Sequence, residues 1–344
     1  MSDTYKVALL TGEKKVEIVE KELKHPVGKQ VLMKVDSCAI CTLEQRIYNG
    51  VMKRYPFAGG HEVAGTVVEV GEAVKSLKKG DKVAARLLTS CGECYFCRSG
   101  HENQCVISFI ANVHEGVGGP GGFAEYVMMD AEKMYKVADD MDLTHAALTE
   151  PLACCVHSIN NANIELGEDV VVIGVGIMGA FHIKLAKLRG ARVIACEVDP
   201  DRLEVAKKMG ADILVNSKDV NAVDKVKEIT DGRGADVVFC TAALTKLAED
   251  AIQMVSKVGR VIMYSSFHPD NPVDLSVNKV HSTEMNITGA VNANRKDFLA
   301  ASRLLSFRLV DPSILISETV PLEKIDYAFQ RAIDPKTYRI VVRP

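Results

Sequence analysis

The chain has 344 residues, of which 47% are hydrophobic and 25% charged, and its formal net charge is −3. This length exceeds what one typical core needs and predicts about two domains. The balance is that of a globular protein, and the apolar runs stay below the roughly 20 residues of a membrane helix. The sequence lacks the excess of basic residues that is typical of a protein that binds nucleic acid or a membrane surface. We therefore expect a small-molecule partner, no nucleic acid and no membrane.

Residues 1 to about 150 predict a compact β-rich domain. Short apolar runs at 31–36, 63–70, 82–85 and 123–129 are separated by Gly and Pro, and helical periodicity is scarce. The first residues lack the long apolar segment of a signal peptide, so we expect a cytoplasmic protein.

A histidine and a carboxylate, His61 and Glu62, stand side by side among glycines directly before the run at 63–70. Cys41 follows the earlier run at 31–36, so the ends of two strands can bring a thiolate to an imidazole. Thiolate and imidazole together favour zinc over magnesium or calcium. We expect a metal site here.

The ten cysteines are better interpreted as metal ligands and buried thiols than as disulfides, because the chain shows no export signal. Four of them, Cys91, Cys94, Cys97 and Cys105, have the spacing that brings four thiolates to one tetrahedral zinc. We predict a closed, structural zinc site in a lobe with few apolar residues of its own.

The pattern changes after Pro151, where apolar strands alternate with helical segments. The strand-like runs at 169–173, 192–196, 235–240 and 259–264 predict a parallel sheet covered by helices. The last run of the chain, residues 338–343, reads as a strand that returns to the first domain.

A glycine motif between the first two of these strands predicts a dinucleotide site. It follows a strand, opens a helix, and contains Gly174, Gly176, Ile177, Met178 and Gly179. In such a motif the first glycine makes the tight turn and the second admits a pyrophosphate. The third lets helix and strand pack closely. The helix N-terminus then binds the anion.

Glu197 ends the second strand, about twenty residues after the motif, where a carboxylate accepts hydrogen bonds from the adenosine ribose. A carboxylate there repels a 2′-phosphate, so we favour NAD over NADP. Arg202, five residues later, weakens that preference and is a second candidate cofactor contact.

Together these motifs resemble the zinc-dependent medium-chain dehydrogenases. The resemblance rests on Cys41, on the four-cysteine lobe, and on the segments GHEVAG (60–65), GGFAEYV (121–127), EPLA (150–153) and GVGIMG (174–179). EPLA is more similar to the sorbitol and polyol dehydrogenases than to enzymes of simple primary alcohols. The resemblance implies an α/β protein with a GroES-like catalytic domain at 1–152 and 295–344. It also implies a Rossmann NAD-binding domain at 153–294 and two zinc ions per chain, one catalytic and one structural.

Within that family, Cys41 and His61 match two constant ligands of the catalytic zinc, and the third ligand stays open. Glu62 resembles a glutamate that binds or exchanges onto the metal. Glu150 matches the carboxylate that polyol dehydrogenases place near zinc, and Cys154 lies where the alcohol-dehydrogenase branch has a cysteine ligand.

One position departs from the family pattern. Leu43 stands where a Ser or Thr usually relays the substrate proton; Thr42 is one residue away, and Glu44 resembles the acid behind the zinc ligands. We hypothesise that Glu62 or Glu150 takes over the proton through bound water. Arg339 resembles a residue that contacts the cofactor pyrophosphate.

The resemblance implies a zinc- and NAD-dependent dehydrogenase of a secondary alcohol, such as a polyol or a sugar-derived alcohol. The alternatives are a primary-alcohol or aldehyde reductase of the same family and a non-catalytic, NAD(H)-binding redox sensor. The family resemblance also implies a homodimer or a homotetramer.

Overall fold

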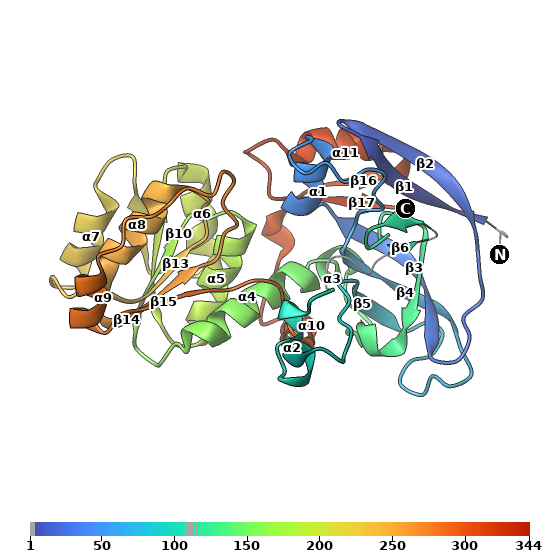
Figure 1. Cartoon of the computed structure of the whole chain (residues 1–344), viewed down its shortest axis with the longest axis horizontal. Helices are drawn as coiled ribbons and strands as arrows, with labels where there is room; N and C mark the ends of the chain where they lie inside the picture. Colours follow the sequence, from blue (N-terminus) through green and yellow to red (C-terminus); the bar gives the residue numbers. More distant parts are fainter. Residues whose placement is uncertain (1–3, 108–112, 115) are drawn as a thin grey trace. The chain divides into compact units, whose positions relative to one another are not determined.

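The computed structural model of the chain describes residues 4–107, 113–114 and 116–344. The chain divides into two compact units, which we describe separately (Figure 1). Unit 1 comprises Met1–Ala153 and Asn294–Pro344, and unit 2 comprises Cys154–Ala293. Each division lies one residue from the position that the family resemblance implied.

A seven-stranded sheet forms the centre of unit 1. Six strands follow one another across it in the order β16 (Ile316–Pro321), β17 (Arg339–Arg343), β3 (Gln30–Ala39), β4 (Glu62–Val70), β5 (Lys82–Arg86) and β9 (Met134–Lys136). The seventh strand, β8 (Tyr126–Asp130), pairs with β3. The last strand of the chain, β17, pairs with β3 in antiparallel fashion. The chain therefore returns to the sheet of the first domain, as expected from the sequence.

Short elements complete unit 1. The two hairpins pair β1 (Thr4–Gly12) with β2 (Lys15–Glu22) and β6 (Val113–His114) with β7 (Val117–Gly118). The helices are α1 (Thr42–Tyr48), α2 (Tyr95–Arg98), α3 (Leu143–Ala146), α10 (Arg295–Ser306) and α11 (Ile325–Ala332). Single 3₁₀ turns are η1 (Glu102–Gln104), η2 (Ala131–Lys133), η3 (Ser313–Leu315) and η4 (Leu322–Lys324). One longer helix, α4 (Thr149–Ala162), begins in unit 1 and continues into unit 2.

Aromatic packing fixes α1 against α11. The rings of Tyr48 and Phe329 are stacked with centroids 4.8 Å apart, and the Tyr48 hydroxyl donates a hydrogen bond of 2.9 Å to Asp326. Both rings are buried in the core of unit 1. Burying rings of this size stabilises a contact by a few kcal/mol. The contact therefore holds in place the short helix that begins directly after Cys41.

Unit 2 is a six-stranded parallel sheet. Its strands lie in the order β12 (Ile213–Asn216), β11 (Arg192–Glu197), β10 (Asp169–Ile173), β13 (Ala235–Cys240), β14 (Val255–Met263) and β15 (Asn286–Gly289). The connecting helices are α5 (Ile177–Leu188), α6 (Pro200–Met209), α7 (Ala222–Ile229), α8 (Thr245–Met254) and α9 (Val277–Thr283). In chain order this is the 3-2-1-4-5-6 arrangement of a Rossmann domain. The predicted parallel sheet is confirmed.

The central strand of unit 2 explains the uninterrupted apolar run in the sequence. Every residue of β10 is buried, and β11 and β13 pair with it in parallel on either side. A strand in the middle of a parallel sheet is covered on both faces, so it has no polar face to alternate with. The glycine motif begins where this strand ends.

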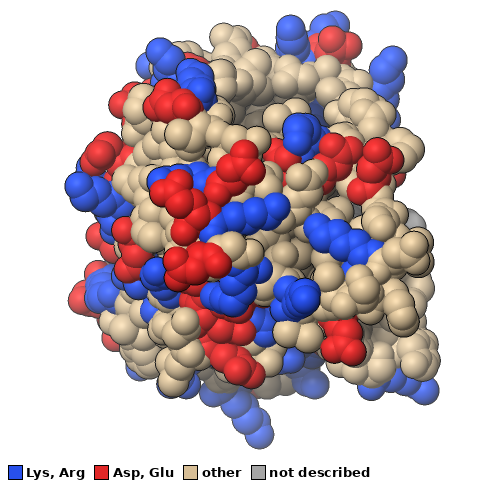
Figure 2. Space-filling model, turned by 90° about the vertical axis from the view of Figure 1, so that its left-hand side faces the viewer, with Lys and Arg blue, Asp and Glu red and all other residues tan. Residues whose placement is uncertain are grey.

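Across the described ranges, no helix combines the length and apolar character that crossing a membrane would take. Figure 2 shows acidic and basic side chains intermixed on the face that it draws.

Candidate metal and nucleotide sites

A glycine turn places His61 directly before β4. Gly60 has a φ of +92°, and a Cβ there would lie 2.6 Å from the backbone nitrogen of Phe123. Both the backbone conformation and the lack of space require glycine. The turn holds the imidazole of His61 in the interior, where the residue is 5% exposed.

Glu44 orients that imidazole. Its Oε1 atom lies 2.7 Å from Nδ1 of His61 and also accepts a 3.0 Å hydrogen bond from the amide of Gly60. Because an ionised carboxylate only accepts hydrogen bonds, Nδ1 donates to Glu44, and Nε2 is the nitrogen left for a metal. This is the arrangement that prepares a histidine to bind a metal. Glu44 therefore lies on the side of the imidazole away from Nε2, and its role behind a zinc ligand stays a prediction.

Two groups of potential ligands share His61. In one, ligand atoms of Cys41, Glu44 and His61 lie within 4.8 Å of one another, and in the other those of His61, Glu62 and Glu150 do. Nε2 of His61 is 4.0 Å from Oε2 of Glu150. That separation is shorter than two zinc–ligand bonds end to end, about 4.2 Å, so one ion can contact both atoms.

A buried ion pair that the sequence analysis missed joins β4 to β17. Glu62 accepts hydrogen bonds from Nε and Nη2 of Arg339, at 2.9 and 2.7 Å, and both side chains are buried. The one feature of the sequence that could have indicated this ion pair is a lone arginine at the start of an apolar terminal strand. The guanidinium of Arg339 binds Glu62. Its contact with the cofactor pyrophosphate stays a prediction.

The charges of the cluster fit a bound cation. Glu44, Glu62 and Glu150 are 0%, 0% and 7% exposed. Burial lowers the pKa of His61, but its interactions with neighbouring groups, first of all the charge of Glu44, outweigh burial and raise this pKa well above its usual value. Burial also raises the pKa of Cys41. The charge of Glu44 thus favours the protonated form of His61, and burial favours the protonated form of Cys41. A zinc ion bound to both residues would displace a proton from each.

The other proposed ligands and relay residues lie in different surroundings. Thr42 is exposed, and Leu43 is partly buried and packs against the core of unit 1. Cys154 belongs to unit 2. Its role as a ligand, like the identity of the third ligand, stays a prediction.

The four cysteines of the lobe have the geometry of a zinc site. Their ligand atoms all lie within 4.8 Å of one another, and the sulfur of Cys91 is 3.9 Å from that of Cys97 and 3.6 Å from that of Cys105. Sulfurs bound tetrahedrally at about 2.3 Å are about 3.8 Å apart. Backbone hydrogen bonds from Cys97 and Val106 lower the pKa of Cys94 to about 6. The residues fit the structural ion that their spacing predicts.

In unit 2, the glycine motif forms the turn between β10 and α5. Gly174 has a φ of +87°, and a Cβ on Gly179 would lie 1.9 Å from the carbonyl oxygen of Gly174. Gly176 is the N-cap of α5, and Ile177 and Met178 form its first turn. The backbone N–H groups at the start of a helix are suited to bind a phosphate.

Glu197 holds this turn, whereas its contact with the adenosine ribose stays a prediction. One carboxylate oxygen accepts a 2.7 Å hydrogen bond from the amide of Val175, and the other accepts from Val198 and Asp199 at 2.7 and 3.2 Å. Nη1 of Arg202 lies 3.5 Å from where a Cβ on Gly176 would be. A carboxylate and a guanidinium thus both lie beside the motif, and the sequence could not show that Glu197 binds the turn itself.

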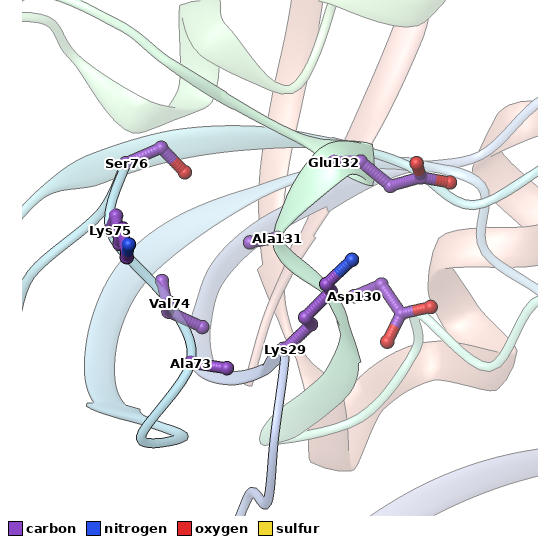
Figure 3. A pocket seen from close by; sticks show the side chains of 8 residues that line it. All are labelled: Lys29, Ala73, Val74, Lys75, Ser76, Asp130, Ala131 and Glu132. Carbon is purple, nitrogen blue, oxygen red and sulfur yellow. The ribbon is translucent and has the colours of Figure 1, made fainter.

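A surface pocket of about 400 Å³ lies elsewhere in unit 1 (Figure 3). Its polar side chains are those of Lys29, Lys75, Ser76, Asp130 and Glu132. All five residues are exposed, and neither histidine nor cysteine lines the pocket. The pocket therefore lacks the ligand chemistry of the two clusters.

Comparisons with known proteins agree with this geometry. The family model of the alcohol dehydrogenase GroES-like domain matches residues 28–139, and that of the zinc-binding dehydrogenases matches 174–306. The chain is 30% identical to a sorbitol dehydrogenase of Halalkalibacterium halodurans, over 95% of each chain. It is 29% identical to a D-arabitol-phosphate dehydrogenase of Enterococcus avium, over 96% of this chain and 94% of that one.

A solved structure extends the likeness over both units. It is a protein described as a short chain alcohol dehydrogenase from E. coli CFT073, complexed with NADH. The TM-score is 0.89 with 25% identity, and the match covers 100% of both chains. With the family matches and the polyol dehydrogenase relatives, this places the chain in the zinc-binding dehydrogenase family, in its polyol dehydrogenase branch.

Proposed function

We propose that this protein oxidises a secondary alcohol, a polyol or a sugar-derived alcohol, by transferring hydride to NAD. The observation that carries the proposal is a pair of ligand groups that share His61, one with Cys41 and Glu44 and one with the buried Glu62 and Glu150. Their donor atoms and charge suit zinc. The sorbitol and arabitol-phosphate dehydrogenases among the relatives support the substrate class.

Cys41, His61 and Glu62 would hold the catalytic zinc. Glu62 follows His61 directly, and Arg339 fixes its carboxylate with two hydrogen bonds while leaving lone pairs for a metal. Ligating carboxylates in proteins are commonly oriented by such hydrogen bonds. Zinc, when bound, supplies a Lewis acid that polarises the substrate oxygen.

Glu150 would accept the proton of the alcohol. Leu43 cannot relay a proton, whereas Glu150 brings a carboxylate within 4.0 Å of the metal-facing nitrogen of His61. Glu44 keeps His61 in the correct tautomer, and burial of the cluster excludes bulk water. The motif at Gly174–Gly179 would bind the cofactor pyrophosphate at the start of α5, and NAD supplies the hydride acceptor.

The direct test follows NADH absorbance with zinc-loaded protein and a panel of polyols, secondary alcohols, primary alcohols and threonine. We expect turnover of a polyol or another secondary alcohol. Turnover confined to primary alcohols would contradict the substrate class. Two zinc ions per chain and tight NADH binding without any turnover would favour the redox-sensor alternative instead.

Two isosteric variants separate the roles of the carboxylates. We expect Glu62→Gln to lose the catalytic zinc, because a neutral amide is a poor zinc ligand. Glu150→Gln should keep both zinc ions and lower kcat about a hundredfold or more, the usual effect of removing a general base. Metal analysis and steady-state kinetics of the two proteins provide the measurement. Full activity of Glu150→Gln with an unchanged pH profile would contradict the proton-acceptor role.

The preference for NAD over NADP is tested at Glu197. Replacing Glu197 with Gln removes a negative charge beside the motif, so we expect the ratio of kcat/KM for NADP to that for NAD to rise roughly tenfold. Arg202→Gln is the matched variant and should lower that ratio. Because Glu197 also binds backbone amides, the melting temperature of each variant is measured with the kinetics. A wild-type preference for NADP would contradict the assignment.

A further inference from the structure

The four-cysteine lobe lies beside the point at which the chain re-enters unit 1. The chain passes from unit 2 to unit 1 between Ala293 and Asn294, and α10 begins at the next residue, Arg295. In the lobe, η1 occupies the residues directly before Cys105. Figure 1 shows the lobe, marked by α2, next to α10, and hydrogen bonds connect η1 to the start of α10.

Two hydrogen bonds from backbone amides to side-chain oxygens make this contact. The amide of Asn103 donates to Oδ1 of Asn294 at 3.1 Å, and the amide of Arg295 donates to Oε1 of Glu102 at 2.7 Å. Nε of Arg295 is 3.6 Å from the same Glu102 oxygen. The first amides of a helix have no acceptor within the helix, so a carboxylate supplied from outside stabilises its N-terminus. Glu102 supplies that carboxylate to α10.

The contact is specific rather than a loose surface encounter. Asn103 and Asn294 are 6% and 4% exposed. Asn294 also caps α10, since its side chain and that of Asp297 form a reciprocal capping box. The residue that caps the helix is thus held by the helix on one side and by the lobe on the other.

The lobe has little of its own to keep η1 in position. Between Cys91 and Cys105, Asn103 and Cys105 are the buried residues, and Tyr95 and Phe96 are exposed. Few apolar contacts mean that the shape of such a segment depends on its cross-links. Here the cross-link is the metal that four converging sulfurs would bind.

We propose that the four-cysteine lobe is a zinc-dependent clamp on the chain crossing at Asn294–Arg295, with Glu102 and Asn103 as its positioning residues. Zinc at the lobe keeps η1 in place, and η1 keeps the first turn of α10 folded. Loss of this zinc makes the segment around Asn294–Arg295 more mobile, as well as the lobe itself.

Hydrogen–deuterium exchange on the full chain tests the clamp. His61→Ala provides a background without the catalytic zinc, so that the remaining ion belongs to the lobe. We expect a chelator that removes this ion to speed exchange in peptides covering residues 293–299 roughly tenfold. Peptides from β10 should not change. Faster exchange across 91–107 with unchanged exchange across 293–299 would overturn the proposal.

Variants that keep the zinc separate the clamp from general unfolding. Glu102→Ala removes the acceptor for the Arg295 amide and should speed exchange at 293–299 while the protein retains its zinc ions. Glu102→Gln keeps an acceptor oxygen and should restore part of the protection. Glu93→Ala is the control, since Glu93 is an exposed carboxylate of the same lobe. Equal effects of Glu102→Ala and Glu93→Ala would overturn the proposal.

Discussion

Buried negative charge is the constraint on which the site in unit 1 depends. Three carboxylates, those of Glu44, Glu62 and Glu150, are at most 7% exposed. An ionised carboxylate in the interior costs several kcal/mol unless a partner compensates it. Arg339 compensates Glu62, and the proton on His61 compensates Glu44. A divalent cation bound by the same residues would complete this balance.

The fold brings these charges together from distant parts of the chain. Glu44 lies on α1, Glu62 begins β4, Glu150 lies in the first turn of α4, and Arg339 begins β17. The ion pair of Glu62 and Arg339 spans 277 positions of sequence. Pairing of β17 with β3, beside β4, makes that contact possible. The return of the last strand therefore contributes a charge to the site as well as a strand to the sheet.

The sequence was sufficient to predict those features whose residues lie close together along the chain. The four cysteines lie within 15 positions, so their spacing alone indicated that they would cluster. The glycine motif lies between one strand and one helix, so its turn could be predicted in the same way. The parallel sheet followed from alternating patterns. By contrast, the partner of Arg339 and the backbone contacts of Glu197 depend on which strands become neighbours. A one-dimensional pattern does not contain that information.

The most direct test of the account is zinc analysis of the purified protein combined with X-ray absorption at the zinc edge. We expect two zinc ions per chain and an average of about 2.5 sulfur ligands per ion, because the lobe supplies four cysteines and the other site supplies Cys41. A single zinc bound by sulfur alone would contradict it. An average near 3 sulfurs per ion would mean that a second cysteine, and not Glu62, is the third protein ligand of the catalytic zinc.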